Sequence, residues 1–186
     1  KMKFKKKNLL SLDKFIEDSL YNKKLGYYMK SNPFGGKGDF ITAPNVSILF
    51  SEMIAIWVIS FWENLNCPKQ FNLIELGAGN GEMMSIMTNT FQRFPQFKNS
   101  CNIKILEKSK LLKKIQRKNI KYKEIKWLNN LDELNDLPCI FIANEFFDAL
   151  PIKQFIKKNN VWHERYVKFN NQMKSEYEDI PFDIKK

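Results

Sequence analysis

The sequence predicts an α/β fold organised around a doubly wound, mostly parallel β-sheet. Apolar runs recur at residues 71–76, 102–107 and 139–143, segments with helical periodicity separate them, and polar residues end or follow each run. Strands covered on both faces read as short, nearly continuous apolar runs, and their alternation with helices favours parallel pairing. Because parallel strands share one carboxyl edge, we expect these polar residues to face one crevice.

The stretch at residues 71–81 is the centre of this prediction. Its apolar run carries Glu75 and leads directly into Gly77, Gly79 and Gly81. Glycines allow a sharp turn and a close approach of the backbone to a ligand. Helical spacing begins after Gly81, so strand, glycine loop and helix follow the order of a nucleotide-binding βα unit.

The first 68 residues are predicted to form an N-terminal helical segment with a long loop. Ser11 is a candidate N-cap of a first helix that Gly26 would end. The segment 27–44 is too rich in glycine and proline for regular structure, and a loop of this length is usually functional or disordered. Residues 47–64 are predicted to form a buried helix.

Composition indicates a globular chain without a metal or disulfide framework. The chain has 186 residues, 44% of them hydrophobic and 27% charged, which favours one domain, or one domain with a small appendage. Its most apolar stretch, residues 46–62, is too short for a membrane span and carries Glu52. The cysteines form no CxxC pair, so we expect no zinc site and a reducing compartment.

The net charge of +11 raises nucleic acid as a partner. The excess lysines concentrate at residues 1–7 and 104–126, without the interleaved aromatic residues that a single-strand binding surface needs. A solvated lysine face is therefore the favoured interpretation, and nucleic acid is the less favoured partner.

Residues 69–186 are predicted to form the nucleotide-binding domain. The second run ends in Glu107, where an acid accepts hydrogen bonds from ribose hydroxyls, although an ordinary strand-end glutamate is the alternative. An amphipathic helix at 109–119 and a weak strand at 121–125 follow. Trp127 and Leu128 are candidates to flank an adenine ring, and Trp127 could equally belong to the core.

The last third of the chain is predicted to contain one more sheet strand and a hairpin. The run at 139–143 leads into Asn144, and a hairpin is expected from 152–156 and 161–167. His163, within this hairpin, is interpreted as an ordinary strand residue. From residue 168 onward the pattern predicts no element.

The spacing of the glycines discriminates between cofactors. Glu82 stands where the third glycine of a dinucleotide loop would fall, which disfavours NAD. Instead, the pattern ExGxGxG at 75–81 resembles motif I of the class I S-adenosylmethionine methyltransferases, whose fold is the Rossmann-like sheet predicted above.

Two further motifs narrow this resemblance. The chain resembles the MidA family from about residue 15 to residue 167. The resemblance rests on the stretches Gly38-Asp39-Phe40-Ile41-Thr42-Ala43-Pro44 and Asn144-Glu145-Phe146-Phe147-Asp148-Ala149-Leu150-Pro151, and on Trp162-x-Glu164-Arg165 after them. The resemblance implies that the chain is a protein arginine methyltransferase. The mitochondrial members of this family assist complex I assembly by methylating an arginine of a core subunit. It implies location in the cytoplasm of a bacterium or in the mitochondrial matrix of a eukaryote.

The resemblance also implies a set of site residues. The cofactor S-adenosylmethionine would be held by Gly38, Asp39, Thr42, Glu75, Gly77, Ala78, Gly79, Gly81, Glu107, Trp127, Leu128 and Asn144. Glu145 and Asp148 would orient the guanidinium of the acceptor as catalytic acids, by analogy with other arginine methyltransferases. Their alternative role is to stabilise a helix N-terminus.

Several departures from the family keep other functions open. Family members are longer, so the chain resembles a truncated N-terminal half, and Asn45 stands where an acid is expected after Thr42-Ala43-Pro44. The prolines of the motif typical of base-modifying amino-methyltransferases are missing after Asn144. The alternatives are a nucleic-acid methyltransferase or basic RNA-binding module, and an inactive remnant that retains cofactor or partner binding.

Overall fold

The computed structural model describes residues 9–36, 38–169 and 174–182. It divides into two compact units, one made of residues 31–147 and the other of residues 1–30 with 148–186. This division differs from the predicted boundary at residue 68. The predicted lysine cluster at residues 1–7 lies outside the described residues.

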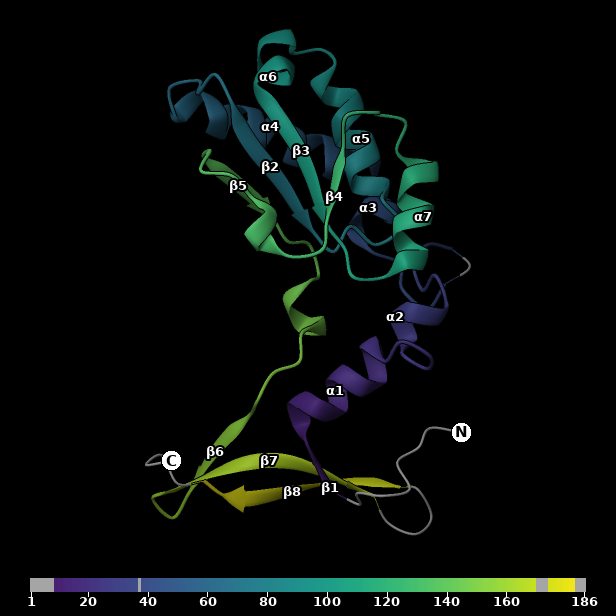
Figure 1. Cartoon of the computed structure of the whole chain (residues 1–186), viewed down its shortest axis with the longest axis vertical. Coiled ribbons are helices and arrows are strands. Elements are labelled where there is room, and N and C mark those ends of the chain that lie inside the picture. Colours follow the sequence, from purple (N-terminus) through teal and green to yellow (C-terminus); the bar gives the residue numbers. More distant parts are fainter. Residues whose placement is uncertain (1–8, 37, 170–173, 183–186) are drawn as a thin grey trace. The chain divides into compact units, whose positions relative to one another are not determined.

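The unit of residues 31–147 contains the predicted parallel sheet (Figure 1). Its strands are β2 (Phe71–Leu76), β3 (Cys101–Leu106), β4 (Lys126–Leu128) and β5 (Cys139–Ile142). Their order is β4-β3-β2-β5, with every pair parallel. The chain therefore extends the sheet from β2 in one direction and then returns to add β5 on the other side of β2. Such a reversal opens a crevice at the carboxyl ends of the two strands, where ligands of open α/β sheets bind.

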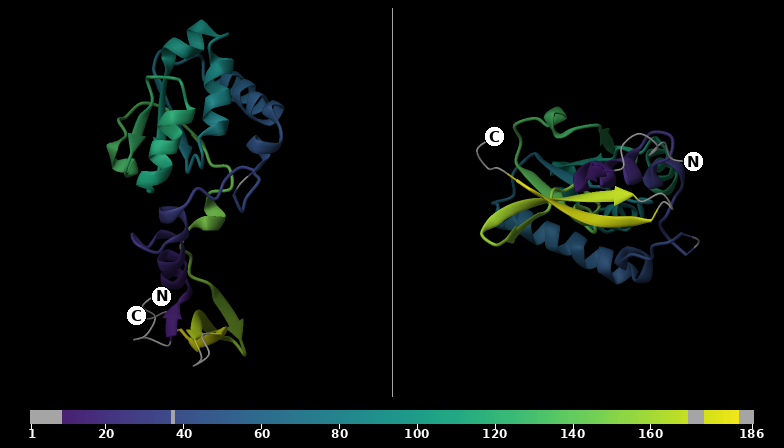
Figure 2. Two further views of the ribbon diagram at one scale, coloured as in Figure 1. Left: turned by 90° about the vertical axis from the view of Figure 1, so that its right-hand side faces the viewer. Right: turned by 90° about the horizontal axis from the view of Figure 1, so that it is seen from below.

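Helices with apolar faces cover one face of this sheet. They are α4 (Ile48–Asn64), α5 (Glu82–Phe91), α6 (Pro95–Ser100) and α7 (Lys110–Asn119). The short helix α3 (Ala43–Val46) contacts α4 and α5, and the 3-10 turn η2 (Leu131–Glu133) precedes β5. Alternate strand residues such as Leu73, Ile105 and Ile140 share one buried core with Met87 of α5 and Val58 of α4. Figure 2 shows α4 and α5 on the same side of the sheet.

The long helix α4 is buried on one side only, whereas the sequence predicts a buried helix. Ala55 and Val58 are fully buried, but Leu49, Met53 and Trp57 on the outer side are more than half exposed. These outer residues recur at spacings of four, so they form one apolar stripe along the helix. No helix among the described residues is long and apolar enough to cross a membrane.

The other unit is built on an antiparallel sheet. Its long strand β7 (Val161–Phe169) pairs with β6 (Phe155–Lys158), β1 (Leu9–Ser11) and β8 (Ser175–Pro181). Two asparagines with positive φ, Asn159 and Asn160, join β6 to β7, and that conformation matches the twist of a tight hairpin. The helix α1 (Leu12–Tyr21) lies beside β7, and α2 (Tyr27–Lys30) follows it.

The structure corrects several predicted elements. A weak strand is predicted at residues 121–125, but the strand β4 consists of residues 126–128. Trp127 and Leu128 therefore belong to the sheet. The helix α6, which has no sequence prediction, begins at Pro95, whose fixed φ suits the first helical position. The strands β1 and β8 have no sequence prediction, and the predicted hairpin pairs with them in a sheet separate from the parallel one.

Candidate active site

A pocket lies at the point where the strand order reverses, between the segments that follow β2 and β5. It is lined by Phe34, Thr42 and Pro44, by Glu75, Gly77, Ala78, Gly79, Asn80 and Met83, and by Asn144 and Glu145. The predicted site residues Thr42, Glu75, Gly77, Ala78, Gly79, Asn144 and Glu145 are therefore brought together, from three separate stretches of the chain.

The glycine loop needs glycine both for its backbone conformation and for its surroundings. Gly77 and Gly79 have φ values of +67° and +53°, which side chains disfavour. A Cβ at Gly77 would lie 2.6 Å from Cδ2 of Phe146, and a Cβ at Gly79 would lie 3.4 Å from the ring of Phe34. The bare backbone of the loop thus forms part of the pocket wall between two aromatic rings.

Glu75 places an unpaired carboxylate oxygen at this pocket. The residue is 3% exposed, and its Oε2 atom has no hydrogen-bond partner. Burial, together with the nearby charge of Glu107, raises the pKa of Glu75 to about 8. A buried acceptor without a partner is costly, so such a group is suited to a ligand that supplies a positive charge or a donor.

Glu107 is buried at the end of β3 and has a donor on each oxygen. The backbone N–H of Ser109 donates to Oε1 at 2.8 Å, and Nε2 of Gln116 donates to Oε2 at 3.0 Å. Burial raises the pKa of Glu107, while these two donors act in the opposite direction. The carboxylate is therefore fixed in orientation, with lone pairs left for further donors.

Ser109 connects this acid to the start of α7 and gives a test of the local geometry. Its side-chain hydroxyl accepts a hydrogen bond from the Leu112 backbone N–H at 3.3 Å, as an N-cap. We expect Ser109→Ala to lower the free energy of unfolding by about 1 kcal/mol, measured by urea denaturation. The control is Ser47→Ala at the start of α4, because the Ser47 side chain makes no capping hydrogen bond; an equal loss in both variants would contradict the assignment.

The residues after β5 form the opposite wall of the pocket. Asn144 and Glu145 both line it, and Glu145 has a positive φ of 48°. This conformation costs a glutamate about 1–2 kcal/mol, and such strain clusters at functional sites. Asp148, the other predicted catalytic acid, is exposed and is the first residue of this stretch in the other unit, so its role stays a prediction.

The remaining predicted cofactor residues lie outside the pocket lining. Gly38 is in a tight turn, where a Cβ would lie 2.2 Å from the Pro33 carbonyl oxygen, and Asp39 is exposed. Leu128 is fully buried, so only its partly exposed neighbour Trp127 has surface to offer an adenine ring. Gly81 packs under α7, and a Cβ added at Gly81 would lie 3.1 Å from the Ile120 side chain.

The structure adds residues to the site that sequence reasoning missed. Phe34 packs on the glycine loop, and no periodicity signals an aromatic residue within an irregular loop. The Asn45 amide donates to the Glu82 carboxylate, so an acid at position 45 would repel Glu82. Gln116 is completely buried. Its position four residues after Leu112 places it on the inner face of α7, and this spacing could have predicted its burial from the sequence.

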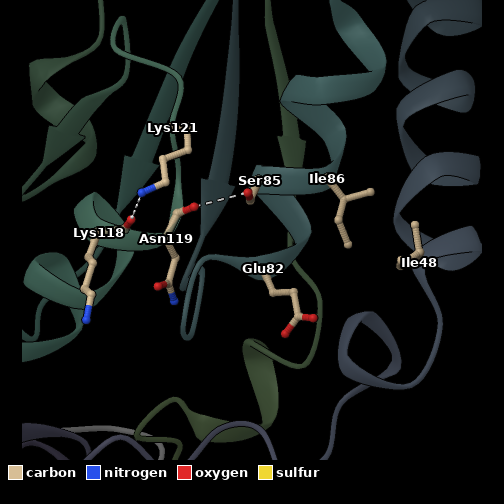
Figure 3. A pocket seen from close by; sticks show the side chains of 7 residues that line it. All are labelled: Ile48, Glu82, Ser85, Ile86, Lys118, Asn119 and Lys121. Carbon is tan, nitrogen blue, oxygen red and sulfur yellow. Dashed lines mark hydrogen bonds between the residues drawn. The ribbon is translucent and has the colours of Figure 1, made fainter.

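A second hollow lies on the outer side of the same unit, between α4, α5 and the end of α7 (Figure 3). Ile48 and Ile86 border it on one side and Lys118 and Lys121 on the other. The Ser85 hydroxyl donates to the Asn119 carbonyl at 3.3 Å, which joins α5 to α7. The described residues hold no group of three or more potential metal ligands.

The fold and the pocket together define a class of protein. A parallel sheet with this strand order, a glycine loop after β2 and buried acids in β2 and after β3 form a nucleotide-cofactor site of the Rossmann-like type. The residues of this site fit a cationic nucleoside cofactor. Glu75 lines the pocket beside the glycine backbone, and its Oε2 atom has no hydrogen-bond partner in the protein, so it is available to a positively charged ligand.

Comparisons with known proteins give the family. Residues 53–186 match the family described as S-adenosyl-L-methionine-dependent methyltransferases. The mitochondrial protein arginine methyltransferases NDUFAF7 of Xenopus tropicalis and Homo sapiens are 30% and 28% identical to this chain, over 87% and 92% of its length. A Burkholderia thailandensis protein solved with bound S-adenosyl-homocysteine superposes with a TM-score of 0.77 at 24% identity, over 94% of this chain and 46% of that one.

This chain belongs to the S-adenosyl-L-methionine-dependent methyltransferase family. The resemblance predicted from the glycine loop and its flanking motifs is thereby confirmed, as is the cofactor class. The chain spans less than half the length of the curated relatives it matches, 43% for Xenopus tropicalis and 44% for Homo sapiens.

Proposed function

We propose that this chain forms the cofactor-binding part of a methyltransferase that acts on an arginine of a protein. The observation that carries the proposal is the pocket at the strand reversal, which combines bare glycine backbone, the orphaned carboxylate oxygen of Glu75 and the strained Glu145. Relatives named as protein arginine methyltransferases support the choice of acceptor.

The cofactor side of the pocket is assigned to the segments after β2 and β3. S-adenosylmethionine, when bound, supplies a methyl group on a positively charged sulfonium. The backbone of Gly77 and Gly79 would lie beside it, Glu75 would balance its positive charge, and Glu107 would accept hydrogen bonds from its ribose. The protein's contribution to methyl transfer is then mainly to hold donor and acceptor close and in line.

The acceptor side is assigned to Glu145, with Asp148 as a second candidate. An arginine side chain arrives as a planar guanidinium with five N–H donors, and a carboxylate orients it through charge-assisted hydrogen bonds. Glu145 lines the pocket opposite the glycine loop and is held by its backbone in the left-handed region.

Glu145→Gln is expected to lower methyl transfer to arginine by roughly 100-fold, because the neutral amide no longer pairs with the guanidinium. Binding of S-adenosylhomocysteine should change by less than about threefold, since the cofactor is assigned to other residues. Transfer of radioactive methyl groups to arginine-containing peptides and isothermal calorimetry measure the two quantities. Glu63→Gln at the exposed end of α4 is the control, and unchanged transfer in Glu145→Gln would remove the assigned role.

The partner and the location are part of the same proposal. We assign a protein substrate, with a respiratory complex I subunit as the first candidate, and either the mitochondrial matrix or the bacterial cytoplasm. Cofactor binding without transfer to any protein would favour a remnant that only binds. Steeply salt-dependent RNA binding in the absence of cofactor binding would favour the nucleic-acid alternative.

A further inference from the structure

The interior of α7 contains a side-chain amide that joins three parts of the cofactor site. Gln116 is completely buried, and its Nε2 donates to the carbonyl oxygen of Gly79 and to Oε2 of Glu107, both at 3.0 Å. Its Oε1 accepts the indole N–H of Trp127 at 2.9 Å. One amide therefore contacts the glycine loop, the acid after β3 and the aromatic residue of β4.

We propose that Gln116 is a positioning residue for cofactor binding, which holds the Glu107 carboxylate ionised and oriented toward the ribose-binding position while it anchors the glycine loop. This inference rests on the proposed function, because it concerns the same cofactor site. It assigns a role to a residue that does not line the pocket and acts through residues predicted to contact the cofactor.

The chemistry of the amide explains why the residue type matters. The two N–H groups of Gln116 can only donate, so the Glu107 oxygen that receives one of them must act as an acceptor. The Ser109 backbone N–H makes the same demand on the other oxygen. A protonated carboxyl would give up one of these acceptor positions, so both donors favour the carboxylate despite its burial.

The surroundings of Glu107 act on its charge in both directions. Lys113 of α7 favours the charge of Glu107, and that charge in turn raises the pKa of Glu75 on the adjacent strand β2. Burial disfavours the charged form. The donors from Gln116 and Ser109 therefore offset part of the effect of burial, and loss of one donor should raise the pKa of Glu107 further.

A second link from the same helix stabilises the arrangement. The Asn119 side chain donates to the Asn80 carbonyl at 2.9 Å, and Ile120 packs under Gly81. Both contacts hold the glycine loop against the end of α7, but neither touches Glu107. Gln116 alone among these three residues joins the loop to the acid.

The test compares two nearly isosteric variants of Gln116. Gln116→Met removes both donors, and we expect it to weaken binding of S-adenosylhomocysteine by roughly 10-fold at pH 7. The weakening relative to wild type should grow as the pH falls from 8 to 5.5, because Glu107 without this donor protonates more readily. Calorimetric Kd values across this pH range provide the measurement.

Gln116→Glu should show the opposite pH trend. At low pH its protonated carboxyl can still donate to Glu107, whereas at higher pH a second carboxylate would repel it. Its weakening relative to wild type should therefore grow as the pH rises. Lys114→Met, on the exposed side of the same helix, is the control and should bind as wild type does.

The possible outcomes separate this inference from the proposed function. A folded wild-type protein that binds no S-adenosylhomocysteine would remove both. If the wild-type protein binds S-adenosylhomocysteine and the ratio of variant Kd to wild-type Kd does not change across the pH range, the proposed function remains and Gln116 has only a structural role. If Gln116→Met does not fold, the trend of Gln116→Glu alone decides, because its sign is specific to a second carboxylate.

Discussion

Gly79→Val is expected to reduce the affinity for S-adenosylhomocysteine by at least about 100-fold, which corresponds to roughly 2.7 kcal/mol. Gly79 adopts a φ of +53°, and a Cβ there would already lie 3.4 Å from Phe34. Valine adds two further carbons and strongly disfavours positive φ. The loop must therefore either shift or place these carbons in the pocket, and both outcomes remove the surface assigned to the cofactor.

Calorimetry on folded protein measures this loss, with circular dichroism as the check on folding. Gly36→Ala is the matched control, because a Cβ at Gly36 meets nothing within 4 Å and no positive φ is recorded there. It should bind as wild type does. Gly79→Ala, which adds one carbon, should give an intermediate loss; a folded Gly79→Val that binds normally would refute the cofactor site.

Glu75→Gln is expected to change how stability depends on pH. Burial and the charge of Glu107 raise the pKa of Glu75 to about 8 from its ordinary value of 4.5. Between these two values the folded state keeps a proton that the unfolded state has lost. Stability of the wild-type protein therefore falls as pH rises through this window, and levels off above pH 8.

The size of this effect follows from the linkage of protonation to folding. One pKa unit corresponds to about 1.4 kcal/mol, so the penalty for Glu75 reaches about 3 kcal/mol at pH 7. A neutral glutamine escapes this penalty. Urea denaturation should show the two proteins with similar stability at pH 4.5, and Glu75→Gln should gain about 3 kcal/mol relative to wild type by pH 7.

The same substitution should weaken the cofactor site. Glu75→Gln removes the carboxyl group that would ionise to balance the sulfonium when the cofactor binds, so affinity for S-adenosylmethionine should fall even where stability rises. Such opposition is expected where a buried ionisable group is retained for function. Glu63→Gln, at an exposed carboxylate, is the control and should change neither quantity; a Glu75→Gln protein with the wild-type pH slope would show that Glu75 carries no buried proton.

Parts of the fold were predictable because they depend on local pattern. The run Phe71–Leu76 and the strand at 139–142 read clearly because strands of a parallel sheet are short, mainly apolar runs. The helix after Gly81 reads clearly because a helix repeats its apolar face. The strands β1 and β8 escaped prediction because each is short or polar and becomes a strand only by pairing with β7. Propensity alone is weak where pairing decides.

The residues of the candidate site also divide into those that the sequence predicted and those that it did not. The glycine loop, Glu75 and Glu107 were predictable because turn geometry and strand-end acids carry the chemistry in their own residue types. Phe34 and the outer stripe of α4 were not, since the position of an aromatic ring in a loop and the exposure of a helix face depend on distant segments. Gln116 lay between these cases, as a polar residue on an apolar helix face.

The sequence by itself therefore determined the alternation of strands and helices in the parallel sheet, the glycine loop and, through that loop's spacing, the cofactor class. The tertiary structure decided which residues meet. It placed Asn144 and Glu145 across a pocket from Gly77 and Gly79, and it joined Glu107 to the glycine loop through Gln116. The physical reason is that these contacts span tens of residues and arise only when parallel strands are brought side by side.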